Sequence, residues 1–594
     1  MRKILSAGLI LSLILLLLSP AFGEAQRPVL TIGDSSGRSG NRFNDQLGMW
    51  QYLEDLIGVE IQYVYLSADE YDAAIASGDL PDIMTTQNNL STILENGVAL
   101  NVDPYLEEYC PNFLQGDTRL SYDVLKQLGG NDGFYFFPSR IGYNGVGYDN
   151  ECSNRGYAVR WDYYKELGYP PINNEDDYLN VLLQMHKNHP FTEEGDPTYL
   201  YGTDRFNGYD VAFRRELSIC YWPAYKYQNN IFTNEVYDGY TDPEHSKFWA
   251  AMAWHNKVYR AGKENGSYDM DLFTQSVEQF EAKCARGQYL GLHSAKGQLY
   301  KEKVRSDPDT LSGYSIVPTA ATNYYTNVYQ LLGNGTSYMW FISANTEHTE
   351  EALKLFNYMC APDFLREFGM GRKGETWDYD EKGVPRMTEY GQEQLDAFKA
   401  GKATGDNYFT RWGTFSKLPS NWPLLRDNAT HPEGYSIDFA TISREYEIAT
   451  MSNNISRDIC EHYGVELPTD AHYKAGGMDF RNDCGEAISS SISSLDRNQI
   501  HILTKAEEAL DDALVDLILA ETDAEFNAIR DKTIRKLIGL GELEVFKAYR
   551  EKWDAAAAVI SPLVREAQIS NGVEPYTAKE YTQYLSGGTE GSLP

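Results

Sequence analysis

Residue types that could carry chemistry are plentiful in this chain, but the spacings of several catalytic and cofactor-binding motifs do not occur. The sequence contains no HExxH zinc motif, no Walker loop and no GxGxxG fingerprint after a predicted strand. His186 and His189 form an isolated HxxH pair, which is more typical of a solvated helix end than of a metal site. With 86 Asp and Glu residues, carboxylate pairs arise by chance, so no glycosidase pair can be assigned.

One segment has part of the pattern of a calcium-binding loop. Suitable residues occupy positions 1, 3, 6 and 12 of an EF-hand-like loop, namely Asp378, Asp380, Gly383 and Glu389. Position 5, however, is Lys382, position 8 is Pro385, and no clear amphipathic helix pair flanks the loop. We therefore favour a turn between two strands, and we expect neither a bound metal nor a cofactor.

Aromatic residues give a more useful signal, because the chain has 44 tyrosines, 24 phenylalanines and 10 tryptophans. A sugar has an apolar face, which a flat ring can cover, and a rim of hydroxyls, which Asp, Asn and Arg can hydrogen-bond. Trp50, Trp249, Trp254 and Trp553 recur with other apolar residues at helical spacings and are expected in the core. Tryptophans outside such faces remain candidates for sugar contact.

The overall charge excludes one large class of function. The chain has 594 residues, with 52 Lys and Arg against 86 Asp and Glu, which gives a formal charge of −34. A phosphate backbone would repel such a chain, so we expect no nucleic-acid partner. The hydrophobic content of 42% is that of an ordinary globular protein and permits a large core.

The amino terminus predicts export. Residues 1–23 contain Arg2 and Lys3, an apolar run, and a small-residue pattern ending at Gly23, which together indicate a signal peptide. The apolar run is shorter than the roughly 20 residues that a membrane-spanning helix needs. No lipobox cysteine follows, so we expect free secretion, a periplasmic location, or attachment to the cell surface through an uncleaved signal.

The chain has 7 cysteines at wide spacings and no CxxC pair. An exported chain can form disulfides, and Cys460–Cys484 is the pairing that sequence separation favours. The alternative, that no disulfide forms, stays equally open.

The elements that must position any binding residues begin with a strand–helix–strand pattern. An apolar strand is predicted over 29–32, a polar loop extends to Asn41, and a helical pattern ends at Gly58. Alternating residues over 59–65 predict a second strand, parallel to the first. A helix over 69–77 and a strand over 80–84 follow. In such a layer, ligands are expected beyond the carboxyl ends of the strands.

Several segments, in order along the chain, carry a family resemblance. They are ASGDLPDI (76–83), GFYFFPSRIGYNGVGYDN (133–150), RWDYYKELGYPPINNEDDY (160–178), FEAKCARGQYLGL (280–292), ISANTEHTEEALKLFNYM (342–359), GETWDYDEKGVPRMTEYG (374–391) and AEFNAIRDKTIRKLIGLGELEVFKAYREKW (524–553). Together they resemble the bacterial extracellular solute-binding proteins of ABC importers, in particular the large type that captures sugars and oligosaccharides. The departures are the missing lipobox cysteine, Asn174 in place of a threonine, and Arg372-Lys373 in a Gly-rich segment.

The resemblance implies a two-lobed α/β periplasmic-binding-protein fold, type II-like, with a hinge between lobes that are discontinuous in sequence. Lobe 1 would comprise residues 27–142 and 313–368, and lobe 2 residues 148–308 and 372–585. Extra carboxyl-terminal helices would pack on lobe 2, and residues 586–594 would form a loose tail.

The resemblance also implies where ligand-binding residues lie, on strand-end loops and beside the crossings. The candidates are Arg38, Asn41, Asp82, Asn88, Arg160, Trp161, Arg205, Trp222, His293, Trp340, Trp377 and Trp412. Some have a structural alternative: Asp82 can cap a turn, Arg160 can pair with Asp162 or Glu166, and Trp340 can lie in the core.

The function implied is the extracytoplasmic substrate-binding component of an ABC transporter. It would be a monomer without catalytic activity that captures a carbohydrate by hinge closure and delivers it to the permease subunits in the membrane. Two alternatives remain open. An exported glycan-degrading enzyme would release products, and a ligand-presenting sensory subunit would bind a membrane receptor in place of a permease.

Overall fold

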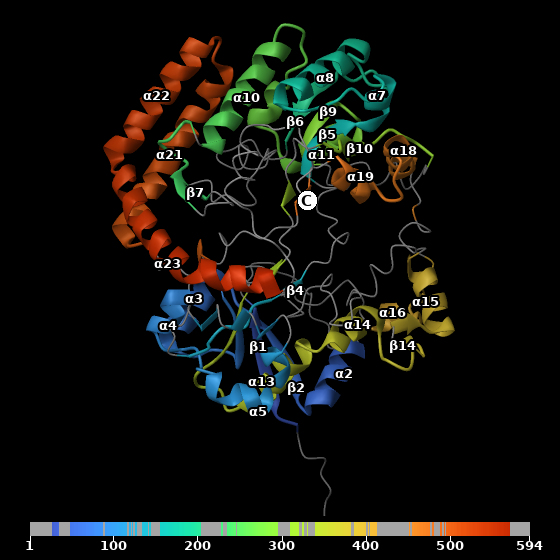
Figure 1. The fold of residues 1–594 in the computed structure, drawn as a ribbon, viewed down its shortest axis with the longest axis vertical. Helices are drawn as coiled ribbons and strands as arrows, with labels where there is room; N and C mark the ends of the chain where they lie inside the picture. The colour runs from blue at the N-terminus through green and yellow to red at the C-terminus, as the bar shows by residue number, and fades with distance from the viewer. Residues whose placement is uncertain are drawn as a thin grey trace, which may run out of the picture.

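The computed structural model describes residues 27–34, 48–86, 90–143, 155–203, 227–294, 309–319, 324–325, 329–330, 339–412 and 451–570, with short gaps inside several of these ranges. Their helices and strands gather into two lobes, which lie at the bottom and the top of Figure 1. The predicted signal peptide at 1–23 and the tail at 586–594 lie outside the described residues.

Lobe 1 is built on a four-stranded sheet in the order β13-β3-β1-β2. β1 (Val29–Asp34) pairs in parallel with β2 (Glu60–Tyr65) and β3 (Ile83–Thr85), and β13 (Trp340–Ile342) runs antiparallel to β3. The sequence pattern therefore predicted the parallel β-α-β start of the chain correctly.

Local sequence signals set the helices of this unit. α2 (Gly48–Ile57) buries its apolar stripe at Met49, Trp50 and Leu53. α3 (Ala68–Ser77) begins at a capping box between Ser67 and Glu70 and ends at Gly78, whose φ of 75° is the left-handed conformation that glycine adopts without a steric penalty.

The other elements of lobe 1 enclose an aromatic core. These elements are α4 (Leu90–Glu95), η1 (Asp103–Tyr105), α5 (Leu106–Tyr109), η2 (Pro111–Leu114), α13 (Thr349–Met359) and α14 (Pro362–Met370). Phe137 stacks on Phe356 with ring centroids 4.2 Å apart, and Phe113 and Phe134 pack against Phe137 at 5.1 and 5.0 Å. These rings join the segment that precedes the first crossing to α13, which follows the return.

Lobe 2 is built on a second four-stranded sheet in the order β10-β5-β9-β6. β9 (Tyr289–Ser294) runs parallel to β6 (Tyr199–Gly202) and antiparallel to β5 (Arg155–Arg160), which pairs antiparallel with β10 (Tyr314–Ile316). The remaining elements on this half include α7 (Trp161–Glu166), α8 (Glu175–Asn188), β7 (Tyr227–Asn229), β8 (Val236–Asp238), α10 (Lys247–Gly262), η4 (Met270–Phe273) and α11 (Val277–Ala285).

The carboxyl-terminal part of the described chain is helical. α18 (Asn454–Tyr463) and α19 (Pro468–Lys474) lie on lobe 2, and α21 (Arg497–Leu519), α22 (Asp523–Leu540) and α23 (Glu542–Ser570) run along one side of the molecule in red and orange (Figure 1). Asn256 of α10 donates hydrogen bonds to the carbonyl oxygens of Ile518 and Ala520, at the end of α21. Leu510, Leu514 and Leu517, at spacings of three and four residues, lie on the buried face of α21.

Two of the predicted lobe boundaries differ from the observed packing. The prediction began the second part of lobe 1 at residue 313, but the strand at 314–316 belongs to the lobe 2 sheet. The prediction gave 372–412 to lobe 2, but the Trp412 ring packs on Tyr52 of α2 at 5.8 Å and its Nε1 donates to the carbonyl oxygen of Glu367 in α14. The physical reason is that apolar side chains of this segment pack on lobe 1. Trp412 lies on α2, and Trp377, Leu395 and Phe409 cluster with Met370 of α14.

The segment at 372–412 contains the residues that have part of a calcium-loop pattern. β14 (Trp377–Tyr379) and β15 (Pro385–Met387) pair antiparallel, and α15 (Glu389–Lys399) and α16 (Tyr408–Trp412) follow them. This pairing confirms the preferred turn between two strands. No cluster of three or more His, Cys, Asp or Glu residues suited to a metal occurs among the described residues.

The Cys460–Cys484 pairing that sequence separation favoured is not formed. Cys460 is free of a disulfide, as are the buried Cys110 and Cys360. Cys152, Cys220 and Cys484 lie outside the described residues. Burial, together with a contact to the Cys110 thiol, raises the pKa of Cys360.

The chain segments that join the lobes pair with one another. β4 (Gly142–Tyr143), just before the first crossing, pairs antiparallel with β12 (Tyr329–Gln330), which lies on the return toward β13. Figure 1 shows β4 between the two lobes. β11 (Tyr324–Tyr325) pairs in parallel with β16 (Met478–Asp479), so a carboxyl-terminal segment joins the same region.

Asp458 fastens α18 to lobe 2. Its carboxylate, 7% exposed, accepts hydrogen bonds from Trp161 Nε1 at 2.8 Å and the Tyr169 hydroxyl at 2.6 Å, and pairs with Lys165. Burial by itself raises the pKa of Asp458, but these three donors outweigh burial and lower it.

Replacing Asp458 with alanine leaves the buried Trp161 indole N–H without its acceptor. We expect a loss of about 2–4 kcal/mol in stability, seen as a fall of several degrees in the thermal melting midpoint. Glu461→Ala, at an exposed position of the same helix, is the control and should change stability by less than about 0.5 kcal/mol. Equal melting of the two variants would contradict the role of Asp458.

Glu542 is a second buried carboxyl group, at the start of α23. It is 0% exposed and lies near Asp238 and Tyr227 of the β7–β8 hairpin. Burial, followed by repulsion from the Asp238 carboxylate, raises the pKa of Glu542 to about 9. The folded chain therefore holds a proton here that the unfolded chain releases at a lower pH.

Because the folded pKa is the higher one, Glu542 should reduce stability progressively as the pH rises from the unfolded value near 4.5 toward 9. Glu542→Gln, which cannot ionise, should melt like the wild type at pH 5 and be more stable by about 1–3 kcal/mol at pH 8. Glu544→Gln, 74% exposed on the same helix, is the matched control. A pH-independent difference between E542Q and the wild type would refute the assignment.

Candidate functional site

On lobe 1, the carboxyl ends of the parallel strands lie on the side from which the chain leaves for lobe 2. Thr86, directly after β3, donates its backbone N–H to the Met339 carbonyl oxygen and accepts the Met339 N–H at its hydroxyl oxygen. The residue after Met339, Trp340, bridges to Phe137. A few residues beyond Phe137, the chain forms β4 between the lobes. The ends of β1 and β3 therefore face the crossing, where an open α/β sheet binds its ligands.

On lobe 2, strand direction identifies the corresponding edge. β5 begins at Arg155, just after the first crossing, and Arg155 is paired with Ser294 at the carboxyl end of β9. Because β6 is parallel to β9, the carboxyl end of β6 at Gly202 lies on the same side. The two lobes therefore turn the carboxyl ends of β1, β3, β6 and β9 toward a common region.

Half of the predicted site residues lie at these strand ends or in the segments that follow them in the sequence. Arg38 and Asn41 follow β1, Asn88 follows β3, and Arg205 and Trp222 follow β6, but all five lie outside the described residues. His293 is the penultimate residue of β9. The structure thus places the backbone of His293 at the facing edge, and ligand contact by these six residues stays a prediction.

Asp82 lies at the other end of its strand. The strand was expected over 80–84 but is observed at 83–85, so Asp82 precedes it. Its carboxylate accepts hydrogen bonds from the Thr31 amide at 2.8 Å and from the Thr31 and Thr346 hydroxyls, each at 2.6 Å. These contacts join β1, β3 and the loop after β13, so the carboxylate serves the packing of lobe 1.

Arg160 and Trp161 also lie away from the facing edge, because they end β5 whereas Arg155 begins it. The Arg160 guanidinium pairs with Asp162 at 2.6 Å, donates to the Gly287 carbonyl oxygen at 2.8 Å, and stacks over the Tyr163 ring at 4.3 Å. The alternative pairing with Asp162 is thus the one observed. Trp161 is 0% exposed and is bonded to Asp458.

The three later tryptophans are all buried. Trp340 is 0% exposed within the lobe 1 core, although it lies at the crossing side of the sheet. Trp377 is 0% exposed, and its Nε1 donates to the Gly371 carbonyl oxygen at 2.8 Å. Trp412 is 4% exposed and packs on α2. Each ring is used in packing within the chain.

The sequence interpretation did not single out two hydroxyl groups at the facing edges. Ser139, between Phe137 and β4, is 0% exposed, and Thr203, directly after β6, is 2% exposed. Neither hydroxyl has a hydrogen-bond partner among the described residues, although buried hydroxyls normally have one. Ser139 lies just before the first crossing and Thr203 just after β6. A search for polar residues at strand ends could therefore have found them.

A third polar group ends β1. Asp34 is 8% exposed and accepts a hydrogen bond of 2.5 Å from the Tyr63 hydroxyl on β2. This bond holds a carboxylate at the carboxyl edge of the lobe 1 sheet, where charge-assisted hydrogen bonds to a polar ligand are strongest.

Comparison with solved structures supports the fold. A solute-binding protein from Bifidobacterium longum infantis, described as HMO-binding and ABC-transporter-associated, is 13% identical with a TM-score of 0.57 over 89% of this chain and 99% of that chain. An N-glycan transport solute-binding protein from Streptococcus pneumoniae is 14% identical with a TM-score of 0.52 over 90% of this chain and 100% of that chain. An alginate-binding protein is 14% identical with a TM-score of 0.53 over 89% and 98%.

Sequence comparison gives the family. A search of curated proteins found no match. The model of the bacterial extracellular solute-binding proteins matches residues 48–363, which is more than half of the chain and includes strands of both sheets. The chain therefore belongs to the bacterial extracellular solute-binding protein family.

Proposed function

We propose that this chain captures a sugar or an oligosaccharide between its lobes and delivers it to the permease of an ABC importer. The observation that carries the proposal is the convergence of four strand ends, two from each lobe, on the crossing region. Polar segments follow these strands in the sequence, and buried hydroxyls without partners among the described residues lie at both edges.

The substrate class is supported by the names of the structural neighbours. They are described as binding HMO, N-glycan or alginate, and a further neighbour with a TM-score of 0.52 is described as a complex with kestose. Identities of 13% to 14% relate these proteins by fold alone, so a carbohydrate substrate for this chain is our proposal. The excess of tyrosine, which has an apolar ring and a polar tip, agrees with it.

Capture would proceed by hinge closure. The β4–β12 pairing keeps the outgoing and returning chains together, so bending at the crossings can change the angle between the lobes without separating their cores. A ligand that contacts both lobes makes more contacts in the closed state than in the open state. Binding therefore shifts the population of molecules toward the closed state. The proposed contacts come from Arg38, Asn41, Asn88, Arg205, Trp222 and His293.

Membership of the extracellular family supports export of the chain, and we propose a soluble monomer without catalytic activity. Within the described residues, no helix is long and apolar enough to cross a membrane. The permease partner remains part of the proposal. Release of products from a glycan would instead indicate a glycan-degrading enzyme. Capture of a membrane receptor in place of a permease would indicate a sensory subunit.

The test is titration of the purified chain with a panel of oligosaccharides, followed by tryptophan fluorescence and by the melting midpoint. We expect saturable binding of at least one oligosaccharide, with a higher melting midpoint and no hydrolysis product by chromatography. Products at catalytic turnover would favour the enzyme. If no sugar changed the fluorescence or the melting midpoint while peptides or polyols bound, the carbohydrate proposal would be rejected.

Trp222→Ala tests the proposed aromatic contact. We expect it to weaken the binding of the same oligosaccharide at least tenfold, because stacking of a ring on a sugar face is lost. Phe191→Ala is the matched control, since Phe191 is an aromatic residue of lobe 2 with 60% exposure that lies before the amino end of β6. Equal affinity of the two variants would remove Trp222 from the site.

A further inference from the structure

Thr203 occupies a defined place at the facing edge of lobe 2. It follows Gly202, which is paired with Leu292 of β9, so Thr203 lies level with His293 on the neighbouring strand. Strands in a sheet lie about 4.8 Å apart, so a ligand at His293 is within reach of Thr203. The Thr203 hydroxyl is buried and without a partner among the described residues, which points to a partner that this part of the chain does not supply.

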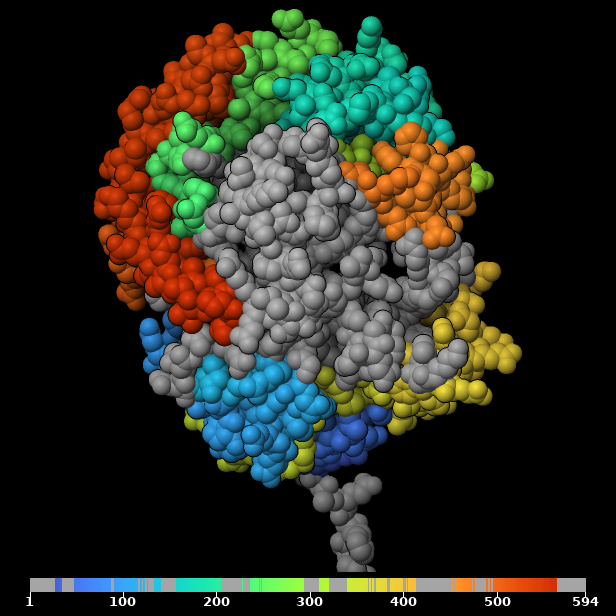
Figure 2. Space-filling view, in the orientation of Figure 1, coloured from blue at the N-terminus to red at the C-terminus, as the bar shows by residue number. Residues whose placement is uncertain are grey.

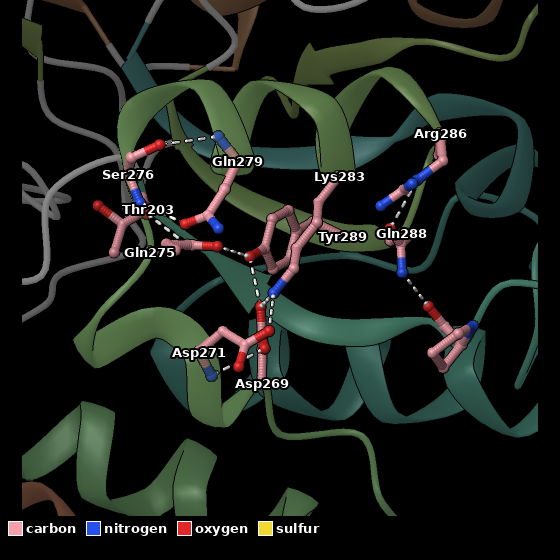
Figure 3. A network of polar contacts seen from close by, with 11 residues as sticks. Thr203, Asp269, Asp271, Gln275, Ser276, Gln279, Lys283, Arg286, Gln288 and Tyr289 are labelled. Atoms are coloured by element: carbon pink, nitrogen blue, oxygen red, sulfur yellow. Dashed lines mark hydrogen bonds and ion pairs between the residues drawn. The ribbon is translucent and has the colours of Figure 1, made fainter.

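The backbone of Thr203 is held by a side chain from another element. Gln275 donates a hydrogen bond of 3.3 Å from Nε2 to the Thr203 carbonyl oxygen, as Figure 3 shows. Gln275 directly precedes α11, whose capping box joins Ser276 to Gln279 at 2.8 and 3.3 Å. The amide of Gln275 is thus presented from a rigid helix start.

A buried network fixes the other end of Gln275 (Figure 3). The Tyr289 hydroxyl lies 3.1 Å from Gln275 Oε1 and 2.5 Å from Asp269 Oδ2, and its proton is shared between these acceptors. Lys283 Nζ donates to Asp269 at 2.6 Å and to Asp271 at 2.9 Å. Because the Gln275 oxygen faces this hydroxyl, its nitrogen must face Thr203.

Two members of the network, Tyr289 and Lys283, have raised pKa values. Burial, and then the Asp269 charge, raises the pKa of Tyr289, so its hydroxyl stays protonated. Burial by itself lowers the pKa of Lys283, but its hydrogen bonds to Asp269 and Asp271 outweigh this and raise it. The Tyr289 ring also occupies the space of a side chain at Gly202, since a Cβ there would lie 2.5 Å from its Cγ.

We propose that the Thr203 hydroxyl binds a hydroxyl group of the carbohydrate, and that Gln275 is the positioning residue that fixes Thr203 for this contact. This inference rests on the proposed function and adds a specificity-determining residue to the site. A threonine hydroxyl both donates and accepts one hydrogen bond, as a sugar hydroxyl does, so the pair is complementary in either direction.

The first test compares two threonines at opposite ends of β6, using the oligosaccharide that the panel identifies. Thr203→Val should raise the Kd about fivefold to tenfold without lowering the melting midpoint, because no hydrogen bond to a described residue is lost. Thr198→Val should lower the melting midpoint and leave the Kd unchanged, because the Thr198 hydroxyl donates to the His189 carbonyl oxygen at 2.6 Å and contacts His186 at 3.0 Å. Thr203→Ser should keep the wild-type affinity.

The second test compares two glutamines that make the same kind of bond. Gln275→Ala should raise the Kd severalfold and speed hydrogen exchange of the Thr203 amide. Gln288→Ala removes a matched 3.2 Å bond to the Pro197 carbonyl oxygen, on the amino-terminal side of β6, and should leave the Kd within about twofold of the wild type.

The outcomes separate this inference from the proposed function. If the wild type binds and T203V binds with equal affinity, Thr203 is not a ligand residue and only this inference fails. If Q275A and Q288A weaken binding equally, the positioning role of Gln275 fails. If the wild type binds no carbohydrate of the panel, the proposed function and this inference fail together.

Discussion

The pairing of β4 with β12 between the lobes is the constraint on which the arrangement depends. Each lobe has its own four-stranded sheet, and the crossings join the two sheets. Because the outgoing and returning chains are hydrogen-bonded to one another there, both sheets turn their strand ends to the same region. Figure 2 shows the two lobes at opposite ends of the surface, in blue and yellow below and in teal and green above, with the red helices running down one side between them.

Three buried or half-buried polar side chains make their hydrogen bonds within a single lobe. Asp82 joins β1 to the loop after β13, Arg160 joins β5 to the loop before β9, and Asp458 holds α18 on α7. Their hydrogen-bonding capacity is occupied within the chain, as the energetic penalty of an unpaired buried charge requires. Ser139 and Thr203 differ, because their hydroxyls lack partners among the described residues and lie where the lobes face each other.

The sequence predicted the fold better than the site, for a physical reason. Apolar periodicity reports which face of an element is buried, so the β-α-β start of the chain was predicted correctly. The loop position of a residue says less about its contacts. Trp377 and Trp412 follow or precede glycine-rich stretches, yet both rings are buried against α14 and α2. A shift of β3 by a few residues was enough to move Asp82 from the middle of the predicted strand to the position before the observed one.

By itself the sequence determined the family, the two-lobed α/β class, the acidic charge and the helical carboxyl terminus, because each depends on composition or on local order along the chain. Only the tertiary structure decided that 314–316 completes the lobe 2 sheet, that 372–412 packs on lobe 1, and that Gln275 reaches Thr203. These facts rest on contacts between residues far apart in sequence, whose pairing is selected by the packing of whole elements and leaves no periodic signal in the residues themselves.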